Sequence, residues 1–294
     1  MSSAEIDRVQ ADTMASMFRS NSAKPRVYDS TRRRLKMLED VGELIRYRDL
    51  LVSLVRRDLT VRYKRSVLGF LWTMLNPLLV MLVMTVVFSN LFRFDIECFP
   101  VYVLAGLLLY NFFSQSTTHA MHNIVWGGGL LNKIYVPKAI FVVSVICVGL
   151  VNLLLALIPL ALIMLATGHA FSPALLFLPA ALLLTLLFAL GVGLAVAALA
   201  VFFVDLVDIY QVGLTILLYL TPLFYPVKVV PSQYLFLIHL NPMYYFVEIF
   251  RQPIYLGTLP ETDILMRATL LAVIALGVGW GFFARKADEF AYHV

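Results

Sequence analysis

Long apolar segments without charged residues follow one another along most of this chain. About 20 apolar residues in a helix cross the hydrocarbon core of a bilayer, and the segments have close to this length or more. The run from Ala139 to Val204 contains no Asp, Glu, Lys or Arg, and a polar turn sequence at residues 167–173 divides it into two. The pattern predicts an all-α membrane protein with six transmembrane helices, at about residues 66–92, 99–121, 139–166, 174–204, 209–224 and 265–284.

Two further segments precede the first predicted span. Residues 1–43 are polar, and we expect them to form a mostly disordered cytoplasmic tail. In residues 44–65 the apolar side chains recur at helical spacing, while basic and polar side chains fall on the opposite face. This pattern predicts a basic amphipathic helix that lies in the membrane interface, although a solvated helix packed on a partner would show the same pattern. The apolar face contains Leu44, Tyr47, Leu51, Leu54, Val55 and Leu59.

The region between the fifth and sixth predicted spans is apolar but broken by proline. Prolines at 231, 242, 253 and 260 leave apolar pieces too short to cross a bilayer. Re-entrant or interfacial half-helices fit this pattern, provided that their interrupted backbone is buried in protein or lines water. We therefore expect residues 66–294 to form one transmembrane domain that includes these half-helices.

The composition agrees with a bilayer as the solvent. Hydrophobic residues make up 61% of the 294 residues and charged residues only 14%. A soluble domain is nearer one half apolar and one quarter charged. The apolar runs are continuous and do not alternate with polar residues, which disfavours a transmembrane β-barrel.

The basic residues are unevenly placed. Fifteen of the 23 Lys and Arg residues precede residue 68. A nucleic-acid-binding arm is an alternative, but this cluster directly precedes a membrane span, where positive-inside orientation and anionic lipid explain it. Six crossings place both termini on the same side of the membrane, and 19 of the 23 Lys and Arg residues fall on that side. We therefore expect both termini in the cytoplasm. Residues 1–43 contain no apolar segment of the signal-peptide type, so we expect the first span itself to direct insertion.

Candidate chemistry is sparse. The sequence has no Gly-x-x-x-x-Gly-Lys-Ser/Thr run to hold nucleotide phosphates, and the glycines at 127–129 lack its lysine. His119 and His122 share a helix face, but a capping or interfacial role explains them better than a metal site. Cys98 and Cys147 stand alone. We expect no catalytic residues, no metal and no cofactor, and hence a protein that is not an enzyme and takes its energy from another subunit.

Four motifs in order along the chain resemble one family. They are residues 57–72 with Asn76-Pro77, then Lys133–Pro137, then Thr221–Tyr225, then Asn241-Pro242 with Arg251. The chain resembles the ABC-2 permease subunits of polysaccharide exporters, which export O-antigen, capsular polysaccharide or teichoic acid. One departure lies after the fourth span, where the family often has Phe-Arg-Asp and this chain has Phe203-Val204-Asp205. A salt bridge from that arginine is therefore not expected.

The resemblance implies a homodimer of permeases that binds two copies of a separate ATPase, with ATP and Mg on that subunit. It also implies that residues 123–136 and the following proline form a helix that couples to the ATPase. The coupling residues would be Asn123, Ile124, Leu131, Lys133, Tyr135 and Pro137. The amphipathic helix would gate entry of a lipid-linked glycan. Its basic end would hold a lipid phosphate or, equally well, would anchor the helix to anionic lipid. These gate residues are Arg57, Arg62, Tyr63, Lys64 and Arg65.

The passage would lie between two permeases, edged by the first and fifth spans, where aromatic rings could contact sugar faces. Its expected lining residues are Trp72, Asn76, Phe88, Tyr219, Phe224 and Tyr225. The expected re-entrant residues are Asn241, Pro242, Glu248 and Arg251. The sequence thus favours the permease of an ATP-driven exporter of lipid-linked polysaccharide in the bacterial cytoplasmic (inner) membrane. Alternatives are an ABC-2 exporter of small lipophilic compounds and, less favoured, a membrane glycosyltransferase or polymerase.

Overall fold

The computed structural model describes residues 42–43, 46–63, 71–90, 96–126, 137–287 and 289–292. In these ranges the chain forms helices and turns without a strand, so the predicted all-α class is confirmed. The expected tail, residues 1–43, lies almost entirely outside the described residues. The longer helices are α3 (Arg48–Tyr63), α4 (Leu71–Asn90), α5 (Phe99–Val125), α7 (Ala139–Ala166), α8 (Leu178–Phe202), α9 (Leu206–Leu220), α11 (Pro242–Arg251) and α12 (Thr262–Lys286). The shorter ones are η1 (Pro173–Phe177), η2 (Val227–Val229), η3 (Ser232–Tyr234), α10 (Leu235–Leu240), η4 (Gln252–Leu256) and η5 (Glu289–Tyr292).

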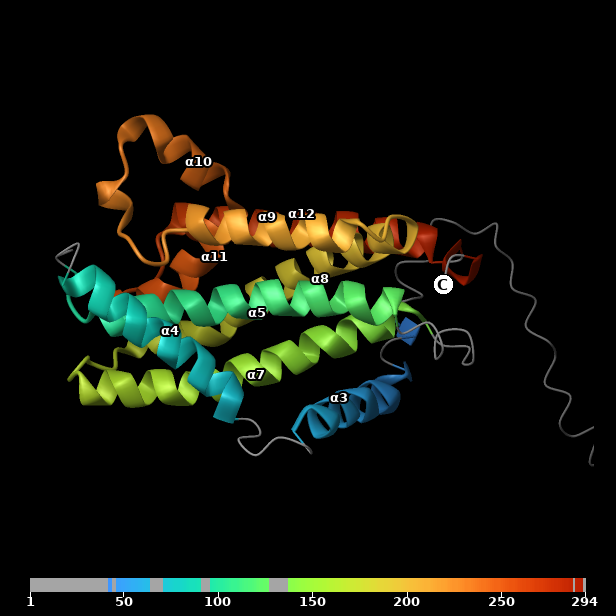
Figure 1. The fold of residues 1–294 in the computed structure, drawn as a ribbon, viewed down its shortest axis with the longest axis horizontal. Coiled ribbons are helices and arrows are strands. Elements are labelled where there is room, and N and C mark those ends of the chain that lie inside the picture. The colour runs from blue at the N-terminus through green and yellow to red at the C-terminus, as the bar shows by residue number, and fades with distance from the viewer. Residues whose placement is uncertain are drawn as a thin grey trace, which may run out of the picture. The chain divides into compact units, whose positions relative to one another are not determined.

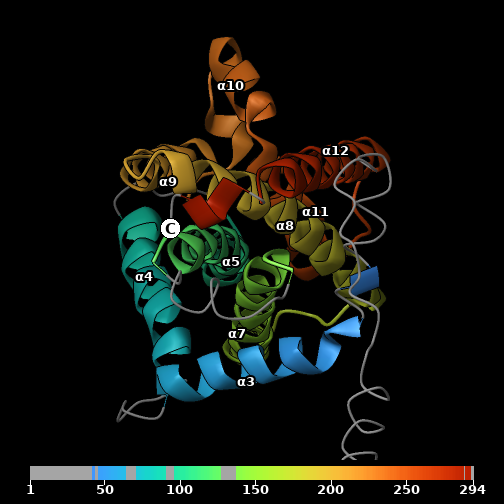
Figure 2. The same ribbon diagram turned by 90° about the vertical axis from the view of Figure 1, so that its right-hand side faces the viewer.

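Helix α5 is the centre of the bundle. It packs against α4, α7, α8, α9 and α11, and the end-on view in Figure 2 shows these helices around it. Val101, Leu104 and Leu109 are completely buried. The first half of α5 is therefore enclosed by protein, whereas its second half also carries polar side chains.

The helix bounds follow the predicted spans closely. Helix α7 covers the predicted residues 139–166, and η1 with α8 covers 173–202 in place of 174–204. The fifth helix is displaced from its predicted position, since α9 runs from Leu206 to Leu220 and not from 209 to 224. It ends there because Thr221 precedes Pro222, and the proline ring disfavours helical backbone at the residue before it. Thr221 is accordingly extended, with φ −82° and ψ 129°.

Three helical segments are long and apolar enough to cross a membrane: Ala139–Ala166, Pro173–Phe202 and Thr262–Lys286. Two shorter apolar segments, Met74–Phe88 and Leu206–Leu220, accompany them. Helix α5 has 27 residues, but Asn111, Gln115, His119 and Asn123 make its second half more polar than that of the other long helices.

Helices α8 and α12 approach each other through glycine. A Cβ atom at Gly191 would overlap the backbone at Ala275, and one at Gly279 would overlap the carbonyl group of Gly191. Small residues permit this close backbone contact between membrane helices. By contrast, Gly277 and Gly281 have no neighbouring atom within 4 Å of the position a Cβ would take, so their small size serves no packing contact within the described residues.

The predicted turn between the third and fourth spans is confirmed, and it also makes a tertiary contact. Gly168 has a φ of +69°, which favours glycine. The Ser172 hydroxyl donates a hydrogen bond to the Gly257 carbonyl oxygen at 2.6 Å, and His169 Nε2 lies 3.0 Å from the Ile254 carbonyl oxygen. The α7–α8 turn is thus fastened to the segment that leads into α12.

Helix α3 packs on α7 with one face. Leu54 is buried, and Tyr47, Leu50 and Leu51 pack against the core. The polar residues predicted on the opposite face, Arg46, Asp49, Ser53, Arg56, Arg57 and Thr60, are exposed. Figure 1 shows α3 at one end of the bundle, with α10 and α11 at the other end.

The proline-rich region forms short helices, as predicted. Helix α10 has six residues and α11 has ten. Both views show α10 projecting from the bundle, while α11 is packed against α5 and α12. The side chain of Asn241 caps α11 by accepting a hydrogen bond from the Met243 amide at 2.9 Å.

Candidate functional site

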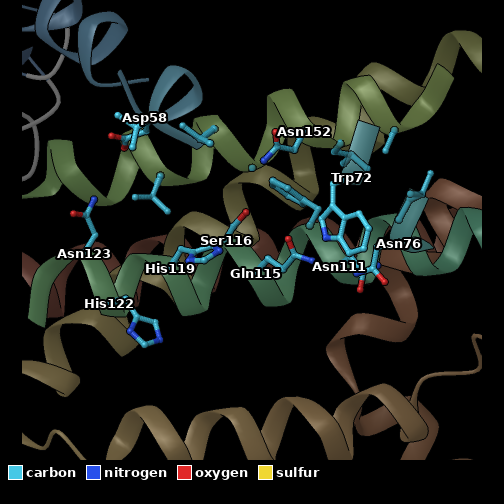
Figure 3. A pocket seen from close by; sticks show the side chains of 18 of the residues that line it. Asp58, Trp72, Asn76, Asn111, Gln115, Ser116, His119, His122, Asn123 and Asn152 are labelled. Carbon is cyan, nitrogen blue, oxygen red and sulfur yellow. The ribbon is translucent and has the colours of Figure 1, made fainter. Parts of the chain in front are cut away.

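A cavity of about 1010 Å³ lies between α3, α4, α5 and α7. Figure 3 shows Asn111, Gln115, Ser116 and His119 along one side of α5, with Asn152 of α7 across from them. These α5 positions recur at intervals of about four residues, so an α-helix places them on one face. Among the described residues, the polar lining comprises Arg57, Asp58, Asn76, Asn111, Gln115, Ser116, His119, His122, Asn123 and Asn152.

The lining of the cavity is mixed. Apolar side chains such as Leu108, Phe112, Val148 and Leu153 make up much of it, and its uncharged polar side chains are amides, a hydroxyl group and imidazoles. Each of these polar groups can donate as well as accept hydrogen bonds. The charged lining residues are Arg57 and Asp58 of α3, which form an ion pair at 2.9 Å. Because these two charges compensate each other, the described lining carries no net charge when the histidines are neutral.

Two tryptophans border the cavity, Trp72 near the start of α4 and Trp126 directly after α5. The side chain of Trp72 is 56% exposed and that of Trp126 is 59% exposed, although both line the cavity. The Trp126 ring stacks on His122, with the ring centroids 4.5 Å apart. Each tryptophan therefore has a ring surface open to a molecule that enters.

Ser116 is the most unusual residue of the lining. It is 2% exposed, and its hydroxyl group is buried without a hydrogen-bond partner among the described residues. Gly149 of α7 faces this hydroxyl, and a Cβ atom there would overlap it. A buried polar group without a partner costs about 1–3 kcal/mol of folding free energy.

A second polar cluster lies at the other end of the bundle, where Arg251 is almost fully buried (4% exposed). It forms an ion pair with Glu248 and donates a hydrogen bond to the Pro222 carbonyl oxygen at 2.8 Å. Burial lowers the pKa of Arg251, but the neighbouring Glu248 carboxylate outweighs this effect, and the net pKa is raised above its ordinary value. The guanidinium group is therefore firmly charged and connects α11 to the end of α9.

Two of the four motifs that were quoted for the resemblance meet in this cluster. Asn241 Nδ2 donates to the Thr221 hydroxyl at 2.8 Å. The Tyr102 hydroxyl of α5 lies 3.0 Å from the Tyr225 carbonyl oxygen and 3.3 Å from that of Pro222. Three segments that are distant in sequence thus form one hydrogen-bonded unit around the residues that follow α9.

The six residues expected to line a passage occupy two places. Trp72 and Asn76 line the cavity. At the other end of the bundle, Phe224 stacks on Phe88 with centroids 6.2 Å apart, and the Tyr225 hydroxyl donates to the Tyr219 carbonyl oxygen at 3.0 Å. Within one chain, the structure therefore does not bring the six residues together.

The coupling and gate residues are only partly described. Ile124 is completely buried, and Asn123 Nδ2 donates to the Phe141 carbonyl oxygen at 3.4 Å. Pro137 is half-buried directly before α7. Arg57 borders the cavity. Arg62 and Tyr63 are the last residues of α3, and their side chains lie outside the described part of the structure. The expected residues outside the described ranges are Leu131, Lys133, Tyr135, Lys64 and Arg65.

The polar face of α5 was not predicted. Asn111, Gln115 and Ser116 were read as part of an apolar span, and His119 and His122 were assigned a capping or interfacial role rather than a place in a cavity. A usable signal was present, because polar residues at intervals of about four in a membrane helix fall on one side and need a polar environment.

Helices of this length and apolar composition are those of an integral membrane protein. The chain belongs to the ABC-2 type transporter family, which it matches over residues 49–255. It is 34% identical over 258 residues to the O-antigen export system permease protein RfbA of Myxococcus xanthus. The matched region covers 87% of this chain and 99% of that protein.

Two further relatives agree with this assignment. The RfbA protein of Klebsiella pneumoniae, also an O-antigen export system permease protein, is 26% identical over 87% of this chain and 98% of its own length. The polysialic acid transport protein KpsM of Escherichia coli is 23% identical over 80% of this chain and 93% of its own length. The family that the sequence motifs indicated is therefore confirmed.

Proposed function

We propose that this chain is the permease subunit of an ATP-driven exporter that carries a lipid-linked polysaccharide across the bacterial cytoplasmic membrane. The observation that carries the proposal is similarity over nearly the whole length of permeases named for O-antigen export. The amide side chains Asn111, Gln115 and Asn152 in the cavity support it, because a hydrophilic cargo needs hydrogen-bonding groups inside an otherwise apolar bundle.

In this proposal the chain crosses the membrane six times, through α4, α5, α7, α8, α9 and α12. Helix α3 lies along the inner interface with its exposed basic residues toward the lipid headgroups. The uneven distribution of Lys and Arg supports placing both termini in the cytoplasm. Helices α10 and α11 then form the outer, re-entrant part.

The energy comes from a partner. The sequence has no phosphate-binding Gly-x-x-x-x-Gly-Lys motif, so ATP and Mg would bind a separate ATPase subunit. We propose two permeases on two ATPases, with the segment from Asn123 to Pro137 as the contact. Its start, at the end of α5, is on the same side as α3, which supports this orientation.

The decisive experiment is deletion of the gene in its host, combined with recovery of the tagged chain from native membranes. We expect polysaccharide to accumulate inside the cell and to disappear from the surface, and we expect an ATPase to be recovered with the tagged chain. Normal surface polysaccharide would favour an exporter of small lipophilic compounds. Sugar transfer by the purified chain alone would indicate a glycosyltransferase.

A further inference from the structure

A second cleft, of about 670 Å³, lies between α10, α11 and the first turns of α12. It belongs to the end of the bundle opposite α3, where α10 projects (Figure 1). Because α12 is long and apolar enough to cross a membrane, its first turns lie at one membrane surface, where the phospholipid headgroups are. The cleft is therefore placed to receive a headgroup from the adjoining leaflet.

The charges that line this cleft are two carboxylates and one guanidinium group. Asp263 and Arg267 form an ion pair at 3.1 Å, whereas Glu261 forms no ion pair with any described residue. With His239 neutral, the described lining has one negative charge in excess. A headgroup with a phosphate alone would be repelled by this excess charge, but a headgroup that also has an ammonium group would offset it.

Arg267 retains hydrogen-bond donors for a phosphate. Its Nε donates to the Asp263 carboxylate at 3.2 Å, and its Nη1 donates to the Tyr245 hydroxyl at 3.2 Å. A guanidinium group has five N–H donors in all, and those on Nη2 bond to no residue in the described part of the chain. The Tyr245 hydroxyl donates in turn to the His239 carbonyl oxygen at 2.8 Å, which joins the arginine to the end of α10. The guanidinium group is thus held beside the cleft with donors left for an anion.

Aromatic rings form the wall of the cleft beside the unpaired carboxylate. The Tyr244 ring stands edge-on to His239, with the ring centroids 5.7 Å apart, and edge-on to Tyr245 at 5.2 Å. Ring faces attract an ammonium group, and a carboxylate accepts hydrogen bonds from its N–H groups. Glu261 and these rings together suit an organic cation.

Beyond the cleft, α12 presents an exposed apolar stripe. Leu270, Ile274 and Val278 follow Arg267 at intervals of three or four residues and are 59%, 51% and 64% exposed, so they continue its face of the helix. From the start of α12 the order is therefore the carboxylate of Glu261, the guanidinium group of Arg267, and then apolar side chains. Ammonium, phosphate and acyl chains follow one another in the same order in an ammonium-bearing phospholipid.

We propose that this cleft binds a phospholipid whose headgroup has a primary ammonium group, as in phosphatidylethanolamine. Arg267 would donate hydrogen bonds to the phosphate, and Glu261 would accept them from the ammonium group. The acyl chains would lie along Leu270, Ile274 and Val278. The bound lipid would fill the space between α10 and α12 and so hold α10 against the bundle. The site is separate from the cavity beside α3 and does not depend on the transported cargo.

The test is native mass spectrometry of the purified full-length chain, titrated with phosphatidylethanolamine or with phosphatidylglycerol that has the same acyl chains. We expect phosphatidylethanolamine to bind about tenfold more tightly, because phosphatidylglycerol lacks the ammonium group and keeps the negative charge. Glycerophosphoethanolamine, the same headgroup without acyl chains, is the third probe. It should not bind at these concentrations, because it cannot use the apolar stripe.

Glu261→Gln should weaken the binding of phosphatidylethanolamine about fivefold, because it removes the carboxylate that accepts from the ammonium group. The substitution spares the Glu261 backbone amide, which donates to Gln252 Oε1 at 3.1 Å. Glu97→Gln is the matched control, since Glu97 is exposed and precedes α5 as Glu261 precedes α12, but does not line the cleft. It should bind like the wild type. Arg267→Gln should weaken the binding of both phospholipids, because both have the phosphate. Melting temperatures of the three variants check their folding.

Equal affinity for the two phospholipids, or tighter binding of phosphatidylglycerol, would overturn the proposal, as would an unchanged preference in Glu261→Gln. Binding of glycerophosphoethanolamine as tightly as the lipid would mean a site for a soluble headgroup and would also overturn it. These failures are distinguishable from failure of the proposed function. If deletion of the gene abolishes surface polysaccharide but the chain shows no preference between the lipids, only the lipid site is wrong. If the preference is present but deletion leaves the surface polysaccharide intact, only the proposed function is wrong.

Discussion

The guanidinium carbon of Arg251 lies 4.0 Å from the centroid of the Tyr102 ring. This cation–π contact adds to the ion pair with Glu248 and the hydrogen bond to the Pro222 carbonyl oxygen. One buried side chain on α11 thereby contacts the central helix α5 and the segment after α9. Arg251 therefore joins α11, α5 and the segment after α9 through a single side chain.

Arg251→Gln should lower the free energy of unfolding by about 3–5 kcal/mol, because it leaves the Glu248 carboxylate in a buried site without its partner. Thermal melting of the purified protein measures the loss. The double variant Arg251→Gln with Glu248→Gln should regain more than half of it, since no unpaired charge remains. Arg267→Gln is the control: that guanidinium is 49% exposed in its pair with Asp263 and should contribute at most about 1 kcal/mol. Equal losses in the two single variants would refute the argument.

Gly279→Ala should destabilise the protein by about 1–3 kcal/mol, because the new Cβ would overlap the backbone of α8 at Gly191. Gly277→Ala offers a matched control on the same helix. It meets no atom within 4 Å and should be neutral or stabilising by up to about 1 kcal/mol through better helix propensity. Melting temperatures and membrane abundance of both variants test this, and similar behaviour of the two would contradict the packing of α8 on α12.

Gly149→Ala should also destabilise, since the added methyl group would collide with the Ser116 hydroxyl. Ser116→Ala in the same chain should recover part of the loss, because the colliding oxygen is removed. We expect a coupling of about 0.5–3 kcal/mol between the two sites, measured by a double-mutant cycle of unfolding. Additive effects would mean that the two residues do not face each other.

Tyr135→Ala should reduce export several-fold while ATP hydrolysis by the recovered complex continues, because the expected coupling segment would no longer transmit the motion. Surface polysaccharide and ATPase activity of the same preparation are the measurements. Trp72→Ala, by contrast, should lower export and leave the ATPase bound with its normal response. Unchanged export in Tyr135→Ala would place the docking surface elsewhere.

Much of the fold could be predicted because the local pattern decides it. Helix α7 has the predicted bounds, because a polar turn that contains Gly168 divides the charge-free run. The end of α9 was misplaced by four residues, because the apolar residues after Leu220 continue the pattern although Pro222 ends the helix. Hydrophobic periodicity alone could not show that the segment after α9 is not helical and is held in place by hydrogen bonds to other segments.

The candidate site was harder to predict, because its residues meet only in three dimensions. Trp72 and Asn76 were selected as lining residues, but the cavity they line depends on the packing of α3 and α7 around α5. The partners of Arg251 likewise come from α5 and from the end of α9. A search for polar residues on one face of each span would have found Asn111 and Gln115, but not the helix opposite them.

The two hydrogen bonds of the α7–α8 turn, from Ser172 to Gly257 and between His169 and Ile254, have a mechanical consequence. They join the tip of a helical hairpin to the π-helical turn η4, which continues α11. A shift of α11 along the bundle must therefore either break these bonds or carry α7 and α8 with it. Since α7 also forms one wall of the cavity, a movement that starts at α11 would also displace that wall.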